Sequence, residues 1–378
     1  MRWMFGAIAR SVALGALLLC LLAGCAGASS TARSGSPTAA ARAGSLSPSS
    51  YVTTDGTRFL FHGQPLKLNG YTFYPAPIGG TSAWDRPSFT TYIDHMLDMG
   101  LSAGQNLARP TDYWDKTNTQ QTWNDPVIWS NMDYLVHAAQ KRGVFVMMDL
   151  SAYKWLLMSH GQDPNDAANW TAFLDFVGAR YSGASSIAAY TIVGEPSPPH
   201  SATETVQLVD FYRSVTDELY RADGGRHLIA AGGFNHMEDE TPQTQWWQQI
   251  DALPHNDIVA FKTYSQHDLN LMPAIAAYAR GIHKPLMVEE FGLPQSMGDG
   301  ASTGEVYNGL QTSRAAFFQS VYDEGSGLGV SSFIFWNLGC QIGDQSYEVS
   351  PRTAGVWQVV TQHGAVPAVA WPTSVAIC

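Results

Sequence analysis

Residues 284–292 read KPLMVEEFG, a short apolar run that ends in two glutamates. Short apolar runs with polar ends are typical of strands buried in a parallel sheet. Further runs of this kind occur along the chain, and stretches with helical periodicity separate them. Together they predict strands at residues 67–71, 103–108, 144–149, 188–193, 227–231, 258–262, 285–289 and 332–336.

The alternation of strand and helix, which includes a helix expected at 306–324, predicts an α/β fold with a parallel sheet. Eight such units favour a (β/α)₈ TIM barrel, because each barrel strand is followed by a helix. An open doubly wound sheet would instead show a glycine-rich nucleotide turn after its first strand. Here the first strand runs into GYTFYP at 70–75, and no second linker follows residue 51. We therefore expect a single catalytic domain over residues 51–378.

The N-terminal residues have the features of an export signal. Arg2 and Arg10 precede an apolar run at 12–23, which is about half of the roughly 20 residues that cross a bilayer. The run ends in LAGC at 22–25, which resembles the lipobox of bacterial lipoproteins. This resemblance implies a lipoprotein signal peptide over residues 1–24 and lipidation of Cys25. An ordinary signal peptide with an incidental cysteine is the alternative.

Residues 25–50 are predicted to form a flexible tether, since Ala, Ser, Gly, Thr and Pro offer too little apolar surface to fold. We expect an exported protein, either lipid-anchored at the outer face of the bacterial cell membrane or secreted. Contact with the membrane would then come from the lipid alone. Loss of residues 1–24 removes two Arg and no acid, so the net charge moves from −11 to −13. Such a charge argues against a nucleic-acid partner.

Cysteine and histidine usage indicates no metal site and no cofactor. No metal-ligand spacing stands out among the 11 His, and the sequence has no phosphate-binding glycine loop. Cys340 and Cys378 remain once Cys20 leaves with the signal and Cys25 is lipidated. In an exported protein these two can form a disulfide, with two separate buried thiols as the alternative. We expect the chain to be a monomer.

The carboxyl ends of the strands carry catalysis in barrels of this kind. The residues that fall at the predicted strand ends are Arg109, Asp149, Glu195, Tyr264, Glu290 and Trp336. Glycoside hydrolysis needs two carboxyl groups around one bond, about 5 Å apart when the anomeric configuration is retained. Glu195 and Glu290 fit these two roles, one as nucleophile and one as acid/base.

The expected surroundings of the two glutamates divide the roles between them. Arg109 and Tyr264 would keep Glu290 ionised through charge and hydrogen bonds. Glu195 stands beside Pro196 with no cation near it in the sequence, so we expect a raised pKa that suits a general acid. The alternative is that both glutamates are surface-loop carboxylates without a catalytic role.

The string at 284–292 resembles the nucleophile strand of clan A glycoside hydrolases, especially the cellulases and β-mannanases of family five. Further strings that resemble the same family, in the same order, are LKLNGYTFYP at 66–75, NLAR at 106–109, IAAYTIVGEPS at 187–197, NDIVAFKTYS at 256–265 and FIFWNLG at 333–339. The resemblance implies that Glu290, and not Glu289, is the nucleophile. It makes Glu195 the acid/base, Arg109 and Tyr264 partners of the nucleophile, and Trp336 the floor of the sugar site.

Two positions depart from that family's pattern. Gly194 stands where the family has an asparagine before the acid/base glutamate, and Lys262 stands where it has a histidine. The absent amide is expected to bind the sugar 2-hydroxyl, so these departures leave the substrate open. Lys262 could meet a different hydroxyl pattern or an acidic substituent.

Aromatic residues make up 12% of the chain, which suits either a sugar-binding cleft or a large aromatic core. We expect two or three tryptophans from the predicted loops to stack on sugars. The candidates are Trp84, Trp114, Trp155, Trp246 and Trp247. His236 and Asp149 are further candidates for contact with substrate, although a structural role in the barrel explains Asp149 equally well.

Together the residues predict a retaining glycoside hydrolase that acts by double displacement through a covalent glycosyl-enzyme. Its expected substrate is an extracellular mannan- or glucan-like polysaccharide or oligosaccharide, cleaved at β-glycosidic bonds as by an endo-β-1,4-mannanase or endoglucanase. An exo-glycosidase or transglycosylase on the same barrel is one alternative, because loop shape decides whether the cleft is blocked. A glycan-binding lipoprotein without turnover is the other, suggested by Gly194 and Lys262.

Overall fold

The computed structural model describes residues 50–74, 84–114, 119–234, 246–341 and 343–369. The predicted signal peptide, the lipidation site at Cys25, most of the tether and Cys378 lie outside the described residues. Within the part that the structure describes, no helix is both long enough and apolar enough to cross a membrane.

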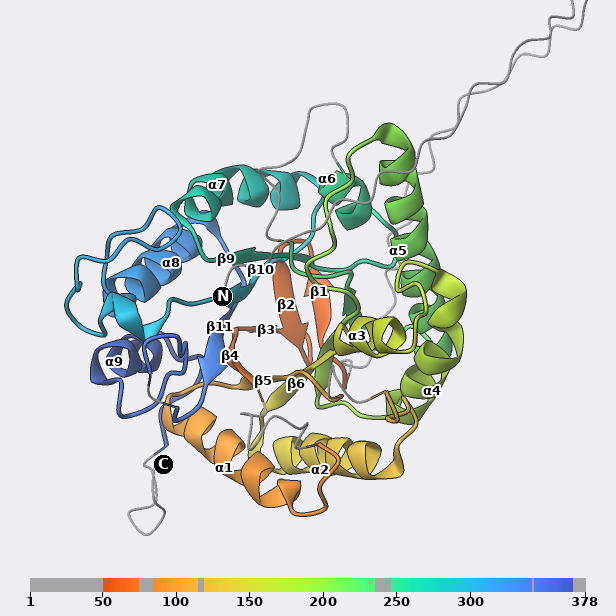
Figure 1. Cartoon of the computed structure of the whole chain (residues 1–378), viewed down its shortest axis with the longest axis horizontal. Coiled ribbons are helices and arrows are strands. Elements are labelled where there is room, and N and C mark those ends of the chain that lie inside the picture. Colours follow the sequence, from red (N-terminus) through yellow and green to blue (C-terminus); the bar gives the residue numbers. More distant parts are fainter. Residues whose placement is uncertain (1–49, 75–83, 115–118, 235–245, 342, 370–378) are drawn as a thin grey trace, which may run out of the picture. The chain divides into compact units, whose positions relative to one another are not determined.

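Parallel strands form the central sheet, and the helices lie around it (Figure 1). The eight strands are β4 (Leu68–Phe73), β5 (Leu107–Pro110), β6 (Phe145–Asp149), β7 (Ile187–Thr191), β8 (Leu228–Ala230), β9 (Val259–Thr263), β10 (Leu286–Phe291) and β11 (Ser332–Leu338). They pair in the order β8-β7-β6-β5-β4-β11-β10-β9, so the first barrel strand in the sequence lies beside the last. The predicted (β/α)₈ barrel is therefore confirmed.

Main-chain bonds that join β8, β9 and the residues next to them close the barrel. The amide of Asp257 donates to the carbonyl oxygen of Ile229 at 2.7 Å, and the amide of Lys262 donates to that of Phe234 at 3.1 Å. Phe234 and Phe261 also form an isolated parallel bridge. These contacts join the two ends of the strand order.

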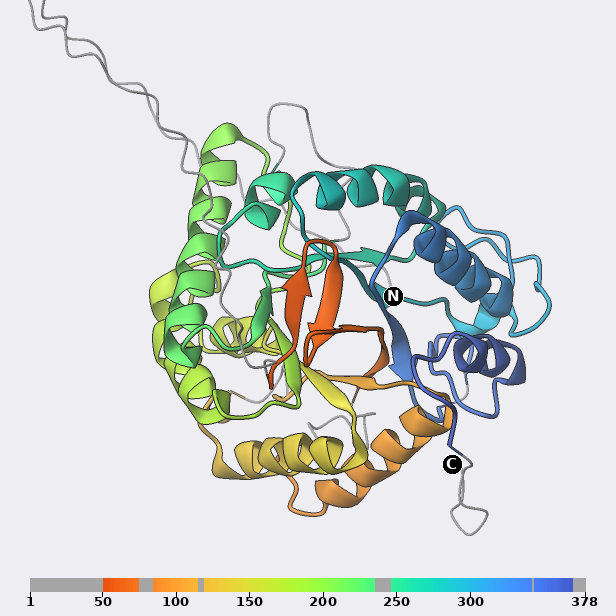
Figure 2. The same ribbon diagram turned by 180° about the vertical axis from the view of Figure 1, so that it is seen from behind.

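A small antiparallel sheet precedes the barrel and covers its amino-terminal end. It consists of β1 (Thr53–Asp55), β2 (Arg58–Phe61) and β3 (Gln64–Leu66). Seen from behind, this sheet lies across the centre of the strand ring (Figure 2). Phe59 is buried in one apolar cluster with Met147 and Met287 of the barrel strands. The carboxyl-terminal end of the barrel is thus the end left for a site.

Helices follow the barrel strands, and residues encoded at their ends set where they begin and stop. The helices of the described residues are α1 (Phe89–Ser102), α2 (Pro126–Arg142), α3 (Ala152–Ser159), α4 (Thr171–Tyr181), α5 (Ala202–Asp223), α6 (Trp246–Asp251), α7 (Gln266–Gly281), α8 (Arg314–Leu328) and α9 (Ala354–Gln362), with short 3₁₀ turns η1 (Ala167–Asn169) and η3 (Gln295–Met297). In α2, for example, the Asp125 side chain accepts bonds from the first free amides, and Gly143 ends the helix in a left-handed conformation.

Three elements differ from the sequence-based expectation. Helix α1 continues to Ser102, so the strand expected at 103–108 begins only at Leu107. The helix expected at 306–324 begins only at Arg314, because the Ser313 side chain caps α8 there. Helix α3 was not predicted, since its 8 residues directly after a strand are too few to show a clear helical period.

We expect Gly70 on β4 to tolerate no side chain. A Cβ at Gly70 would lie 2.1 Å from the main-chain oxygen of Leu107 on β5, which has no room to move aside. Gly70→Ala should therefore lower the free energy of unfolding by about 3 kcal/mol. Gly183 is the matched control, because nothing lies within 4 Å of its added Cβ. Gly183→Ala should change stability by less than about 1 kcal/mol in urea unfolding, and equal effects would contradict this packing.

Candidate active site

A cleft of about 440 Å³ opens at the carboxyl ends of the barrel strands. Its wall includes Arg109, Glu195, Lys262, Glu290 and Trp336. These residues come from β5, β9, β10 and β11 and from the loop after β7. Parallel strands with their ends at one face bring together residues that are far apart in the sequence, as predicted for this fold.

Three donors hold Glu290, which stands on β10. Its Oε1 accepts bonds from Nη1 of Arg109 at 2.6 Å and from Nζ of Lys262 at 2.7 Å, and its Oε2 accepts one from the Tyr264 hydroxyl at 2.9 Å. Burial alone would raise the pKa of Glu290, but the charges of Lys262 and Arg109 and the bonds from Lys262 and Tyr264 lower it to about 2. Arg109 and Tyr264 contact Glu290 as predicted, and Lys262 adds a cation that was not predicted on this carboxylate.

These three donors stay protonated at neutral pH. Burial would lower the pKa values of Arg109 and Lys262, but the carboxylates beside them raise both above their usual values. Burial and the charge of Glu290 raise the pKa of the Tyr264 hydroxyl well above its usual value. All three groups therefore donate hydrogen bonds to an ionised Glu290.

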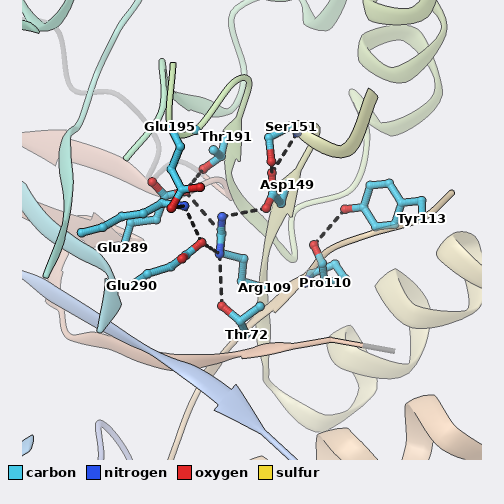
Figure 3. A network of polar contacts seen from close by, with 12 residues as sticks. Thr72, Arg109, Pro110, Tyr113, Asp149, Ser151, Thr191, Glu195, Glu289 and Glu290 are labelled. Carbon is cyan, nitrogen blue, oxygen red and sulfur yellow. Dashed lines mark hydrogen bonds and ion pairs between the residues drawn. The ribbon is translucent and has the colours of Figure 1, made fainter. Parts of the chain in front are cut away.

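Arg109 lies at the centre of a buried ion network (Figure 3). Besides its bond to Glu290, its guanidinium lies 2.6 Å from Oδ2 of Asp149 and 3.3 Å from Oε1 of Glu289. The amide and hydroxyl of Ser151 donate to Oδ1 of Asp149 and fix that side chain in turn. Asp149 is 1% exposed. It therefore positions Arg109, and because it also lies among the residues around the cleft, its contact with substrate stays a prediction.

Glu289, the residue before the nucleophile candidate, is completely buried. Its Oε1 accepts a bond from Oγ1 of Thr191 at 2.8 Å and pairs with Arg109. Burial raises the pKa of Glu289, although the charges of Arg109 and Lys262 oppose this. The register of β10 shifts between Val288 and Glu290, which lets two successive glutamates both reach Arg109. The usual alternation of side chains along a strand would have sent one of them outward.

Glu195 stands in the loop after β7, with 42% of its side chain exposed. Its φ of 52° lies in the left-handed region, and its amide donates to the carbonyl oxygen of Gly233 at 3.1 Å. Nζ of Lys262 lies 3.4 Å from its Oε1, and Nζ of Lys154 donates to its carbonyl oxygen at 3.3 Å. Two cations therefore lie near Glu195, although none is close to it in the sequence. The barrel brings Lys262 from β9 to Glu195, a contact that separation in the sequence conceals.

The two glutamates share the ammonium group of Lys262. The oxygens that it contacts can be no further apart than the sum of 2.7 Å and 3.4 Å. This upper limit for one pair of oxygens is compatible with the roughly 5–5.5 Å between the carboxyl groups of retaining pairs. The geometry fits a retaining pair.

Aromatic rings complete the wall of the cleft. Trp336, on β11, is partly exposed, and its peptide bond to Asn337 is cis. Its ring centroid lies 5.7 Å from that of Tyr74. Tyr307 and Tyr347 also line the cleft and are joined through their hydroxyls. These rings provide the apolar faces that the C–H surfaces of a pyranose require.

Most of the tryptophans proposed for the cleft are instead part of the core. Trp155 lines the cleft and is 37% exposed. The prediction for Trp114 is wrong, because it is 3% exposed and packs edge-on against Phe173 in an aromatic cluster. The other three, also buried, are Trp84, Trp246 and Trp247. His236 lies outside the described residues.

The residues that line the cleft and were not predicted include Asp112, Lys154, Tyr307 and Tyr347. Lys154 precedes Trp155 shortly after β6, so its place behind a strand end could have indicated it. Tyr307 and Tyr347 stand in long loops well past their strands, and no local signal in the sequence marks them.

Residues 62–322 match the family model for cellulase, glycosyl hydrolase family 5. The chain belongs to glycosyl hydrolase family 5. The resemblance to family five is thereby confirmed, and all of the strings that carried it, except the one at 333–339, lie within the matched residues. The protein is a glycoside hydrolase, and the contacts of its paired carboxylates with one ammonium group are compatible with the retaining type.

Relatives of this family 5 enzyme include mannan-degrading proteins. Probable mannan endo-1,4-β-mannosidases A of Aspergillus flavus and Aspergillus oryzae are each 25% identical over 297 residues, which cover 66% of this chain and 73% of theirs. The crystal structure of an endo-1,4-β-mannanase from Rhizomucor miehei matches with a TM-score of 0.61 at 18% identity, over 83% of this chain and 98% of that one. An exo-β-1,4-mannosidase from Opitutaceae bacterium strain TAV5 matches with a TM-score of 0.56 at 14% identity, over 81% of this chain and 61% of that one. At such identities the two structures show a shared fold.

Cys340 follows β11 and is disulfide-bonded. The alternative of a free thiol at this position is therefore wrong. Cys378 lies outside the described residues, so the bond between Cys340 and Cys378 stays a prediction.

We expect Lys262→Met to move the acidic limb of the activity profile to higher pH. The charge of Lys262 helps to hold the pKa of Glu290 at about 2, so without it the nucleophile takes up its proton at a higher pH. For hydrolysis of an activated aryl β-glycoside, the midpoint of the acidic limb of kcat/KM should move up by about one pH unit. Lys154→Met is the control, because Lys154 donates to main-chain oxygens and should leave the limb in place. A limb unmoved in Lys262→Met would contradict the assigned effect.

Proposed function

We propose that this family 5 enzyme is an endo-acting β-mannanase, or a closely related β-glucanase, that acts on a polysaccharide outside the cell. The observation that carries the proposal is the pair Glu195 and Glu290 on either side of one ammonium group in an open cleft. The mannan endo-mannosidases of Aspergillus support mannan as the polymer. They are relatives rather than equivalents, so a glucan is kept as the second candidate.

The first step is attack of Glu290 on the anomeric carbon. Its Oε1 accepts bonds from two cations, Arg109 and Lys262, whereas Oε2 accepts one from the neutral hydroxyl of Tyr264. Oε2 therefore keeps the more available electron pair and forms the bond to the anomeric carbon. Glu195 gives its proton to the glycosidic oxygen as the bond to the leaving sugar breaks.

The second step returns both carboxyl groups to their starting states. Glu195, now ionised, takes a proton from water, and the water oxygen attacks the anomeric carbon. The bond to Glu290 breaks and its electron pair returns to a carboxylate that Arg109 and Lys262 stabilise. Two successive inversions at one carbon leave its configuration retained.

Trp155 supports cleavage inside a chain. Its ring is 37% exposed, and Nζ of the adjacent Lys154 lies 5.0 Å from the ring centroid. The same Nζ donates to the carbonyl oxygen of Glu195, so the ring lies on the acid/base side of the cleft. The leaving part of the glycan must lie on that side, where Trp155 offers a stacking surface. A surface beyond the scissile bond suits a substrate that extends in both directions.

We expect Glu290→Ala and Glu195→Ala to lose activity in different ways. On a panel of β-mannan, glucomannan and β-glucan both should fall by at least about 1,000-fold, because each carboxyl group acts in the chemical step. On an aryl glycoside with an easily departing phenol, Glu195→Ala should keep a far larger share of its first step, since that phenol needs no proton. Glu324→Ala, at an exposed glutamate on α8, is the control and should match the wild type.

The products separate the remaining candidates. Mixed oligosaccharides from the outset support endo action, whereas single sugars from the outset mean an exo-glycosidase. Tight binding of glycan without product after long incubation would mean a binding protein. Full rates in both glutamate variants of an active enzyme would contradict the assignment of the pair.

We also propose that the enzyme works at the outer face of the cell membrane, held by lipid on Cys25. The LAGC string at 22–25 and the Ala/Ser-rich tether that follows support this location. Cys25→Ser should release the protein from membranes into the medium in a bacterial host that processes lipoproteins. Cys20→Ser is the matched control and should stay on the membrane fraction. Continued membrane association of Cys25→Ser would exclude lipid on this residue as the anchor.

A further inference from the structure

Gly194 and Lys262, the two departures from the family pattern, lie against each other. A Cβ built on Gly194 would lie 3.3 Å from Nζ and 3.6 Å from Cε of Lys262. The φ of Gly194 lies outside the left-handed region, so its backbone conformation does not demand glycine. The space that a side chain at 194 would enter is instead occupied by the end of Lys262.

The ammonium group of Lys262 is held inside the cleft. Lys262 pairs with Glu290 across β9 and β10 and is 5% exposed, yet it lines the cleft wall. Its Nζ donates to Glu290 at 2.7 Å and stands 3.4 Å from Glu195. An ammonium group has three N–H donors, so these two contacts leave one for a bound molecule.

The position of this donor matches one hydroxyl of the substrate. The anomeric carbon must lie between Glu195 and Glu290, and C2 is bonded to it. A donor between the two carboxylates can therefore reach the hydroxyl on C2. We infer that Lys262 donates a hydrogen bond to the sugar 2-hydroxyl, in the space that Gly194 leaves free. Bonds to this hydroxyl strengthen as the anomeric carbon gains positive character, so the contact favours the transition state.

An acidic sugar fits this ammonium group less well than a neutral one. Lys262 already faces Glu290 and Glu195, so an anionic substituent there would meet two carboxylates at the same place. A neutral hydroxyl can accept the remaining N–H without that repulsion. Mannose and glucose differ only in their configuration at C2, so Lys262 lies where the two hexoses differ. This inference rests on the proposed function and specifies which residue of its site contacts the sugar 2-hydroxyl.

The test compares a sugar with its 2-deoxy analogue. Removal of the 2-hydroxyl from mannose or glucose gives the same sugar, so one aryl 2-deoxy-β-glycoside is the control for both hexoses. In Lys262→Met, kcat/KM should fall about 10- to 100-fold further on the hydroxyl-bearing glycoside than on the 2-deoxy glycoside. The effect of the Lys262 charge on Glu290 acts on both compounds alike. The ratio therefore reports the contact with the 2-hydroxyl alone.

Further variants keep the inference testable if Lys262→Met turns out to be inactive. Gly194→Ala keeps the ammonium group but places a methyl carbon 3.3 Å from it, so the same selective loss should appear at smaller size. Lys262→His should lose the selectivity, and Gly194→Asn added to it should restore part of it by supplying an amide donor. Lys154→Met, which lacks a lysine that bonds main-chain oxygens, should leave the ratio unchanged.

The outcomes separate this inference from the proposed function. Equal losses on both glycosides in Lys262→Met and Gly194→Ala, from a wild type that is active, would overturn the role of Lys262 and leave the hydrolase intact. A wild type that cleaves no glycoside and forms no covalent adduct on Glu290 with an activated 2-deoxy-2-fluoro glycoside would instead contradict the proposed function.

Discussion

The buried guanidinium group of Arg109 is the contact on which the site depends. From β5 it reaches Asp149 on β6 and both Glu289 and Glu290 on β10, with each heavy-atom distance at or below 3.3 Å. Loss of one partner from a buried ion pair costs roughly 3–5 kcal/mol, because the other charge stays buried without compensation. The position of Glu290 and the packing of three strands at the cleft therefore depend on one side chain.

Arg109 contacts three carboxylates, so its single positive charge does not neutralise them. The charge of Lys262 is therefore important as the second cation of the network. Lys262 neutralises part of the remaining negative charge, and its contacts with Glu195 and Glu290 set the spacing of the catalytic pair. A side chain at residue 194 would crowd that lysine, because an added Cβ would lie 3.3 Å from Nζ. The two departures from the family pattern are thus linked, because the end of the long Lys262 side chain lies beside the small residue Gly194. The chemistry of cleavage is kept, while the group that faces the sugar has changed.

The sequence was enough to predict the barrel and two of the contacts of Glu290, because both follow from local patterns. Strand periodicity and the residue at each strand end are local, and so the contacts of Glu290 with Arg109 and Tyr264 came out as predicted. Contacts across the barrel were not predictable in this way, and Lys262 beside Glu195 is the clearest case. The sequence also did not predict which tryptophans are exposed. A tryptophan after a strand can turn inward, as Trp114 does, or outward, as Trp155 does. Nor does the usual alternation of a strand reveal that Glu289 joins Glu290 at Arg109.

The ionisation of Glu290 in the free enzyme tests this account most directly. Glutamate labelled with ¹³C at the side-chain carboxyl allows each group to be titrated by NMR, with Glu290→Gln used to assign the resonance. The account predicts that the Glu290 signal stays that of a carboxylate through the acid range, with a pKa of about 2. A signal that titrates near the ordinary value of 4.5 would show that Arg109 and Lys262 do not hold the nucleophile ionised, and would contradict the account.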